Sequence, residues 1–309
     1  MRSRELCEFE KRISEINNRL SHFNFISKQF LLDNEKRLQN NLKKDVPEVY
    51  LENPCASQFN INIGEVEDKA IETTNYLLDT VFVFANTQFE VYLLDVYNFV
   101  RNNFDNSLPE PPDSKIYQTI LEGLNVDIEN DIENLFSSSY EYFKLRRNAI
   151  MHRKTEKRFQ GALELLVTGQ FRNDPDKLKL FRKSQLNGQE LNREWKSYTK
   201  SIDDKNIRSY TIRNLSFTNR ELSHFTFSEL TDFLNFLRLY AKMIDFAILS
   251  KIERKKLVEY CLGKYDSYYL RDHTKDSAEK FRSSFTRISR IELNLQLTEE
   301  EILSHQKGV

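Results

Sequence analysis

The stretch VFVFANTQFEVYLLDVYNFV, residues 81–100, decides the fold class of this chain. It carries apolar side chains on most faces of a helix, with few polar residues between them. A helix of that kind is surrounded by protein, because only a core can cover apolar side chains on every side. We therefore expect a long helix over residues 66–104 at the centre of the molecule.

The composition predicts further helices around this one. The 309 residues include only 7 Gly and 6 Pro, well below average usage, while Leu, Glu, Lys and Arg are plentiful. With 39% hydrophobic residues, the chain can bury a sizeable core. The sequence thus predicts an all-α fold of one large domain or two smaller ones.

Residues 1–64 are expected to form an N-terminal helical arm and a connector. Six apolar residues recur at spacings of three and four, which is typical of a narrow stripe on a helix: Leu6, Phe9, Ile13, Ile16, Leu20 and Phe23. Such a helix either serves as a coiled-coil or dimer arm or packs on its own domain, and about three heptads do not decide between the two. Pro47, Pro54 and Gly64 mark residues 46–64 as the connector.

Three prolines at positions 109–112 separate the central helix from the next helical region. A short helix is expected over residues 116–124, followed by a longer one over 127–153. Another helix is expected over residues 158–167, ending near Gly169.

Residues 170–225 differ in composition and read as a small basic insertion. Residues 172–220 hold twelve bases and six acids. The weakly alternating part IRSYTIRNLSFTN, residues 207–219, is compatible with a short β-hairpin. The insertion is either a segment that binds nucleic acid or a solvated segment on the surface, since an excess of charge does not by itself identify a ligand.

Two capping boxes predict the starts of later helices, TFSE at 226–229 and TEEE at 298–301. The first begins a helix over residues 226–250 with a continuous apolar stripe. This helix would close a bundle formed by residues 65–252, and residues 253–309 would form a helical tail.

The hexamer RNAIMH, residues 147–152, lies near the end of the helix that precedes the insertion. Arg147 falls in line with an apolar stripe that contains Phe136, Tyr140, Phe143 and Ile150. Asn148 and His152 share one side of the helix, whereas Arg147 and His152 are about 140° apart on an ideal helix. The long Arg side chain, a distortion near Met151, or two subunits that each supply one group could bridge this angle.

RNAIMH resembles the R-x4-6-H motif of the HEPN superfamily, in its common form with Asn directly after Arg. The resemblance extends to a helical bundle with the motif late in a middle helix, and covers residues 66–167 and the helix at 226–250. It implies a metal-independent endoribonuclease that acts as a homodimer, with two motifs facing each other across a composite cleft. It also implies an acidic partner on the preceding long helix. Glu90 is the candidate, and a surface carboxylate that pairs with a structural cation is the alternative.

The chemistry of these residue types suits RNA cleavage. The imidazole of His152 titrates near neutrality and can serve proton transfer. The planar fork of Arg147 can stabilise charge on phosphate oxygens, and Asn148 can orient the phosphate or the imidazole. Nearby bases would hold the RNA backbone: Arg146, Arg153, Lys154, Lys157 and Arg158. Attack by the 2'-hydroxyl would leave a 2',3'-cyclic phosphate, so DNA should not be cleaved.

Other features of the sequence bear on the cellular compartment, on membrane attachment and on cofactors. Cys7, Cys55 and Cys261 are far apart and have no histidine at ligand spacing, which disfavours both disulfides and zinc and indicates the reducing cytoplasm. No signal peptide or membrane anchor is visible. No cofactor is expected, because no Gly-rich phosphate loop or carboxylate pair for metal appears.

The resemblance also suggests a biological role, although other functions stay open. Free-standing HEPN nucleases of this size mostly resemble bacterial toxins or antiphage effectors, so an antitoxin or a defence-system protein would be a partner besides RNA. The first alternative is a non-catalytic HEPN module that binds RNA or a protein. The second is a helical scaffold that assembles through the N-terminal arm.

Overall fold

The computed structural model describes residues 1–110, 122–123, 130–152, 163–171, 208–217, 224–269 and 277–306, and gives the backbone alone for 130–138, His152 and both strands. Most of the described residues are helical, as predicted. The elements are α1 (Arg4–Gln39), α2 (Val46–Val49), η1 (Ala56–Gln58), η2 (Ile63–Glu65), α3 (Val66–Asn103), α5 (Asn130–His152), β1 (Leu163–Phe171), β2 (Arg208–Phe217), α7 (Phe227–Lys251), α8 (Arg254–Tyr269), α9 (Ala278–Leu293) and α10 (Glu299–His305).

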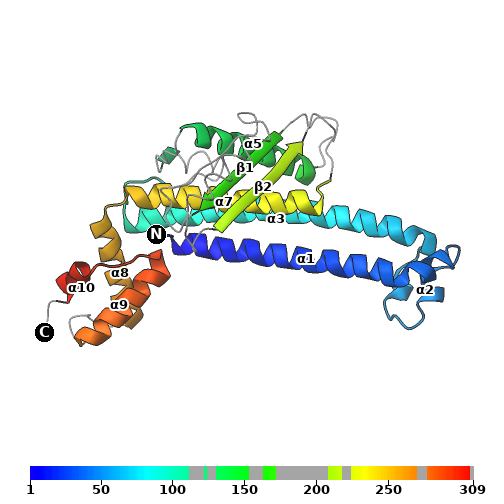
Figure 1. Cartoon of the computed structure of the whole chain (residues 1–309), viewed down its shortest axis with the longest axis horizontal. Coiled ribbons are helices and arrows are strands. Elements are labelled where there is room, and N and C mark those ends of the chain that lie inside the picture. The colour runs from blue at the N-terminus through cyan, green and yellow to red at the C-terminus, as the bar shows by residue number, and fades with distance from the viewer. Residues whose placement is uncertain are drawn as a thin grey trace.

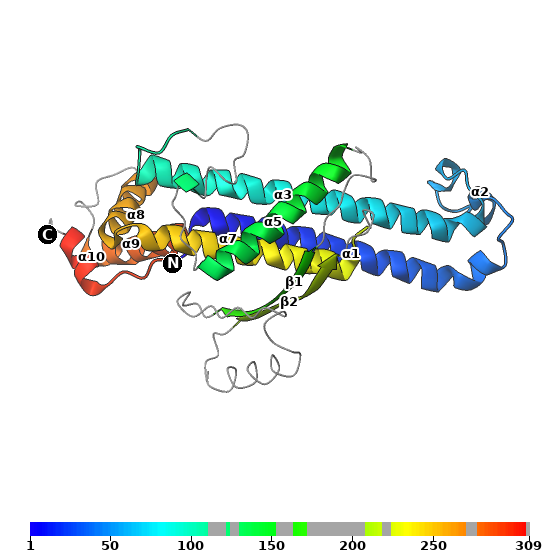
Figure 2. The ribbon, with the colours of Figure 1, turned by 90° about the horizontal axis from the view of Figure 1, so that it is seen from above.

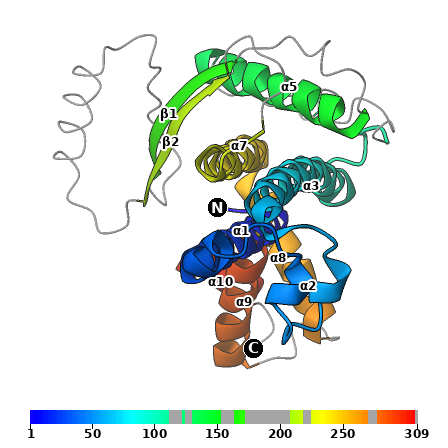
Figure 3. The same ribbon diagram turned by 90° about the vertical axis from the view of Figure 1, so that its right-hand side faces the viewer.

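The long helices α1, α3 and α7 contact one another, and α5 crosses α3 and α7 on the face away from α1 (Figures 1 and 3). Phe89 of α3 lies where all four helices meet. Its ring centroid is 5.9 Å from that of Phe9 in α1, 5.1 Å from Tyr140 in α5 and 5.6 Å from Tyr240 in α7. These four side chains are buried, so the apolar stretch of residues 81–100 forms the central helix that the sequence predicts.

The predicted helix starts are confirmed by their capping contacts. The hydroxyl of Thr226 accepts from the backbone N–H of Glu229, and the Glu229 side chain accepts in return from the backbone N–H of Thr226. Thr298 and Glu301 form the same reciprocal arrangement at the start of α10. Each pair satisfies N–H groups that the first turn of a helix leaves without a partner.

The region around the basic insertion differs from the prediction. Residues 163–167, expected in a helix, belong to β1, which pairs antiparallel with β2 from Leu163↔Phe217 to Phe171↔Arg208. Residues 208–217 of the alternating stretch therefore form one strand of a two-stranded antiparallel sheet and not a hairpin by themselves. The helix prediction was wrong because the partner strand is remote in sequence, and strand pairing overrides a weak local preference for helix. β2 also contacts α7.

The arm, the bundle and the tail share one contiguous core. Leu6, Phe9, Ile13 and Leu20 of α1 are buried with residues of α3 and α7, so this part of α1 packs on its own chain. Buried residues of α8, α9 and α10 belong to the same core. After Leu20, α1 runs together with the first part of α3 past the N-terminal end of α7, toward α2 (Figure 2).

A buried carboxylate fixes the start of α1. Asp245 of α7 is 1% exposed and accepts hydrogen bonds from the backbone N–H of Ser3, at 2.9 Å, and from the Ser3 hydroxyl. Burial raises the pKa of Asp245 to about 6. Burial, followed by the nearby charges of Asp245 and Glu292, raises the pKa of Glu5 to about 7. Both carboxyl groups therefore bind protons more tightly in the folded chain than in the unfolded chain.

This arrangement predicts that Asp245 contributes less to stability as the pH rises. Below about pH 4 both states hold the proton; above it the unfolded chain releases the proton first, so the free energy of unfolding falls until the folded carboxyl also ionises. Urea titrations measure the free energy of unfolding of the wild type and of Asp245→Asn. Between pH 4 and pH 8, the wild type should lose about 2–3 kcal/mol of this free energy relative to the variant. A difference independent of pH would contradict the assignment.

Candidate active site

Helix α5 places Arg147 at the edge of the bundle. Tyr140 and Phe143, which precede it on the same stripe, are buried, and Ile150 packs partly buried against the core. The Arg147 side chain is 25% exposed, so most of it is covered by protein and a part reaches solvent. The position in line with the apolar stripe is thus confirmed for the described side chains.

The structure brings Arg147 together with Glu90, the acidic candidate on the preceding long helix. Arg147 Nη1 lies 2.6 Å from Glu90 Oε1, and the Glu90 side chain is 26% exposed. The two groups come from α5 and α3, two helices that contact each other and that cross in Figure 2. A charge-assisted contact at the half-buried rim limits how the guanidinium can turn.

The hydroxyl of Tyr140 lies within the electrostatic influence of this pair. Burial raises the pKa of Tyr140 well above its ordinary value; the negative charge of Glu90 adds to the rise, and the positive charge of Arg147 opposes it. Tyr140 therefore stays a neutral phenol. Tyr140 packs against Phe89, the neighbour of Glu90 in sequence, and both aromatic side chains are buried.

Two motif residues, Asn148 and Met151, are exposed on α5. Met151 and Leu145, which precedes the motif, are each 58% exposed. His152 is the last residue of α5, about 7.5 Å along the axis from Arg147, and its side chain is outside the described residues. The four bases proposed to hold RNA beyond the helix also lie outside them: Arg153, Lys154, Lys157 and Arg158.

Arg146 does not have the role that the sequence suggested. It is 1% exposed, its guanidinium carbon lies 3.8 Å from the ring centroid of Phe225, and its Nη1 donates to the Tyr142 hydroxyl at 3.4 Å. Burial lowers the pKa of Arg146. A side chain enclosed in this way cannot contact an RNA backbone, so Arg146 instead joins α5 to the start of α7. The sequence alone did not distinguish Arg146 from Arg147, because both lie on the same helix and the residue that covers Arg146, Phe225, is remote in sequence.

One histidine with a carboxylate partner was missed in the sequence. His224, just before α7, has its Nδ1 2.9 Å from Asp79 Oδ2 of α3, and its side chain is 55% exposed. No local spacing could reveal a pair joined by tertiary packing. The pair anchors the chain between β2 and α7 to α3, beside the ring of Phe225 that covers Arg146.

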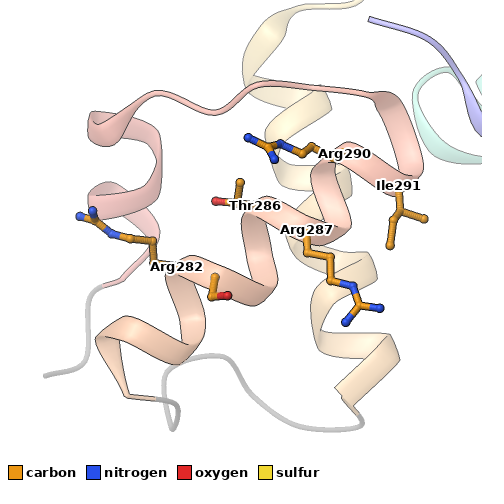
Figure 4. Close-up of a pocket in the computed structure, with 6 residues that line it drawn as sticks. Arg282, Thr286, Arg287, Arg290 and Ile291 are labelled. Carbon is orange, nitrogen blue, oxygen red and sulfur yellow. The ribbon is translucent and has the colours of Figure 1, made fainter.

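Helix α9 carries a cationic surface, on the far side of α1 from α5 (Figure 1). A shallow hollow of about 450 Å³ is lined there by Arg282, Ser283, Thr286, Arg287, Arg290 and Ile291. Figure 4 shows Arg282 and Arg290 projecting on one side of the helix and Arg287 on the other. Arg282 is engaged by Glu299 at 2.7 Å. The hollow offers positive charge but no lining group suited to proton transfer, which favours α5 as the site of chemistry.

The described residues contain no cluster of three or more His, Cys, Asp or Glu arranged to hold a metal ion. Within the same residues, no helix has both the length and the apolar character needed to cross a membrane. Comparisons with protein-family models, with curated proteins and with solved structures give no match.

Proposed function

We propose that the chain is a metal-independent endoribonuclease of the HEPN type, acting as a toxin or antiphage effector. The observation that supports this most is the contact between Arg147 and Glu90 at 2.6 Å. The resemblance pairs a motif arginine with an acidic residue on the preceding long helix, and these two side chains meet at the half-buried rim of an all-helical bundle. That such remote positions meet is not explained by composition or helix periodicity.

Each motif residue takes one part of the cleavage reaction. His152 accepts the proton of the ribose 2'-hydroxyl as its oxygen attacks phosphorus, or protonates the departing 5'-oxygen as the bond to phosphorus breaks. Arg147 stabilises the negative charge that develops on the phosphorane oxygens, and Asn148 orients the phosphate. Glu90 holds the guanidinium in a fixed direction, which lowers the reorganisation needed when RNA binds. A second copy of the chain supplies the remaining groups across a composite cleft.

The direct test is cleavage of single-stranded RNA in excess EDTA, read out by mass spectrometry of the products. We expect fragments ending in a 2',3'-cyclic phosphate and a 5'-hydroxyl, with no cleavage of DNA of the same sequence. His152→Ala should lower the rate by about 10²–10⁴-fold, because it removes the proton-transfer group. His22→Ala, an exposed histidine of α1, is the matched control and should retain wild-type activity.

Equal cleavage by the wild type and His152→Ala would overturn the proposal, as would the absence of cleavage for every RNA offered. The second result would favour a non-catalytic module that binds RNA. One observation favours this second candidate over the first: Arg147 already holds the Glu90 carboxylate, so its guanidinium is less available to stabilise charge on a reacting phosphate. RNA retained by the wild type without product formation would then be the expected outcome.

A further inference from the structure

The part of α1 after Leu20 and the part of α3 before Leu78 form a small unit together with the segment that joins them. We call this unit, residues 21–77, the extension. Within it, as described, no residue of α1 after Leu20 and none of α3 before Leu78 is buried. A small separate core at its tip consists of Val46, Ala56 and Ile63. The extension is thus held together mainly at its tip.

A hollow of about 310 Å³ lies between α1, α3 and this tip. Its walls are mainly aromatic and aliphatic, and include Phe23, Phe30, Tyr50, Phe59, Val66 and Ala70. Sites for small molecules in proteins are typically concave, mostly apolar and of about 300–1,000 Å³, with a few polar groups that fix orientation. The hollow matches this description in size and in chemistry.

The aromatic wall of the hollow is fixed by specific contacts. The Tyr50 ring lies under the guanidinium of Arg37, with 4.4 Å between the guanidinium carbon and the ring centroid. The Tyr50 hydroxyl donates to Asn34 Oδ1 at 3.2 Å, and Arg37 donates to the backbone carbonyl of Val49. Phe30 lies 6.1 Å from Tyr50, centroid to centroid. These contacts hold the wall in place without filling the space, which preorganises the hollow for a guest.

The charge at the rim determines the kind of guest. Lys69 is the one charged residue among those that line the hollow. Its ammonium group lies 2.6 Å from Glu72 one turn further along α3, and both side chains are substantially exposed, at 48% and 65%. An exposed ion pair of this kind contributes little stability, so the ammonium can turn to an anion at the mouth of the hollow at low cost. Asn53 and Thr73 add polar groups to the lining.

We propose that the hollow is a binding site for a small amphiphile, with an apolar chain or ring inside and an anionic group on Lys69. This site is independent of the ribonuclease chemistry and lies in a part of the chain that the motif does not use. Guest binding should also stabilise the extension, because a ligand that binds only the folded form raises its stability. The backbone amides at 21–39 and 66–77 should then exchange with solvent more slowly.

The test is a titration of the full chain with decanoate and, separately, with 1-decanol, followed by calorimetry and by amide hydrogen exchange. We expect one decanoate per chain and slower exchange confined to the extension. Lys69→Met should weaken decanoate binding about tenfold, equivalent to loss of one charge-assisted contact, and leave decanol binding unchanged. Ala70→Trp should fill the hollow and abolish binding of both.

Thr80→Trp is the matched control, because Thr80 is an exposed residue of α3 outside the hollow. It should bind both ligands like the wild type. Circular dichroism will verify that Ala70→Trp keeps its helices, and Lys69→Met provides a second test at an exposed position. The proposal would be overturned by no saturable binding to the wild type, by equal binding to Ala70→Trp, or by Lys69→Met weakening both ligands alike.

Discussion

Arg147→Ala should lower the rate of RNA cleavage by about 10²–10³-fold while the helical bundle stays folded. The guanidinium is the group proposed to stabilise the negative charge on the phosphorane oxygens, and its loss removes an interaction that is stronger in the transition state than in the ground state. The side chain lies at the rim, 25% exposed, so its removal leaves no large cavity. Single-turnover cleavage at saturating enzyme measures the effect on the chemical step.

Arg101→Ala is a matched control for this experiment. Arg101 of α3 is also ion-paired and similarly exposed, at 28%, with Glu110 as its partner at 3.3 Å. Its loss should cost a comparable small amount of stability, on the order of 1 kcal/mol or less, and leave the cleavage rate unchanged. Arg147→Lys separates charge from shape, because lysine keeps the charge but loses the planar fork. We expect it to recover a minor part of the activity.

Glu90→Gln tests whether the carboxylate orients the arginine. A glutamine keeps the size and one acceptor oxygen but not the charge, so a fall in rate smaller than that of Arg147→Ala is expected. Cleavage by Arg147→Ala at a rate within about threefold of the wild type would show that the pair with Glu90 is structural. The same result would remove the main support for the ribonuclease proposal.

Phe89→Ala should lower the free energy of unfolding by about 3–5 kcal/mol. Phe89 is fully buried and its ring contacts aromatic residues of α1, α5 and α7. Its truncation therefore leaves a cavity between the four helices that small shifts of the helices do not fill. A loss of that size is a large fraction of the stability of an ordinary domain. Urea denaturation followed by far-ultraviolet circular dichroism measures it directly.

The control is Phe84→Ala on the same helix. Phe84 is 50% exposed, so its truncation removes less buried surface and opens no internal cavity. A loss of about 1 kcal/mol or less is expected there. If both variants lost the same stability, the four helices would not share the single core that their contacts indicate.

The local pattern of the sequence was sufficient to predict the main helices. Apolar residues on most faces of the 81–100 stretch predict a helix largely covered by protein, and capping boxes at Thr226 and Thr298 define helix starts through contacts only three residues apart. The same local geometry placed Arg147 on a buried stripe. These predictions succeeded because each depends on neighbours within one or two turns of the chain.

Tertiary structure decided what depends on remote partners. It joined Arg147 to Glu90 and His224 to Asp79, and it buried Arg146 beneath Phe225 although the sequence placed it beside an exposed motif. It also made residues 163–167 a strand, because β2, which is remote in sequence, offers hydrogen bonds to them. Helix periodicity fixes which residues share a face, whereas the element that covers this face is set by packing between segments far apart in sequence.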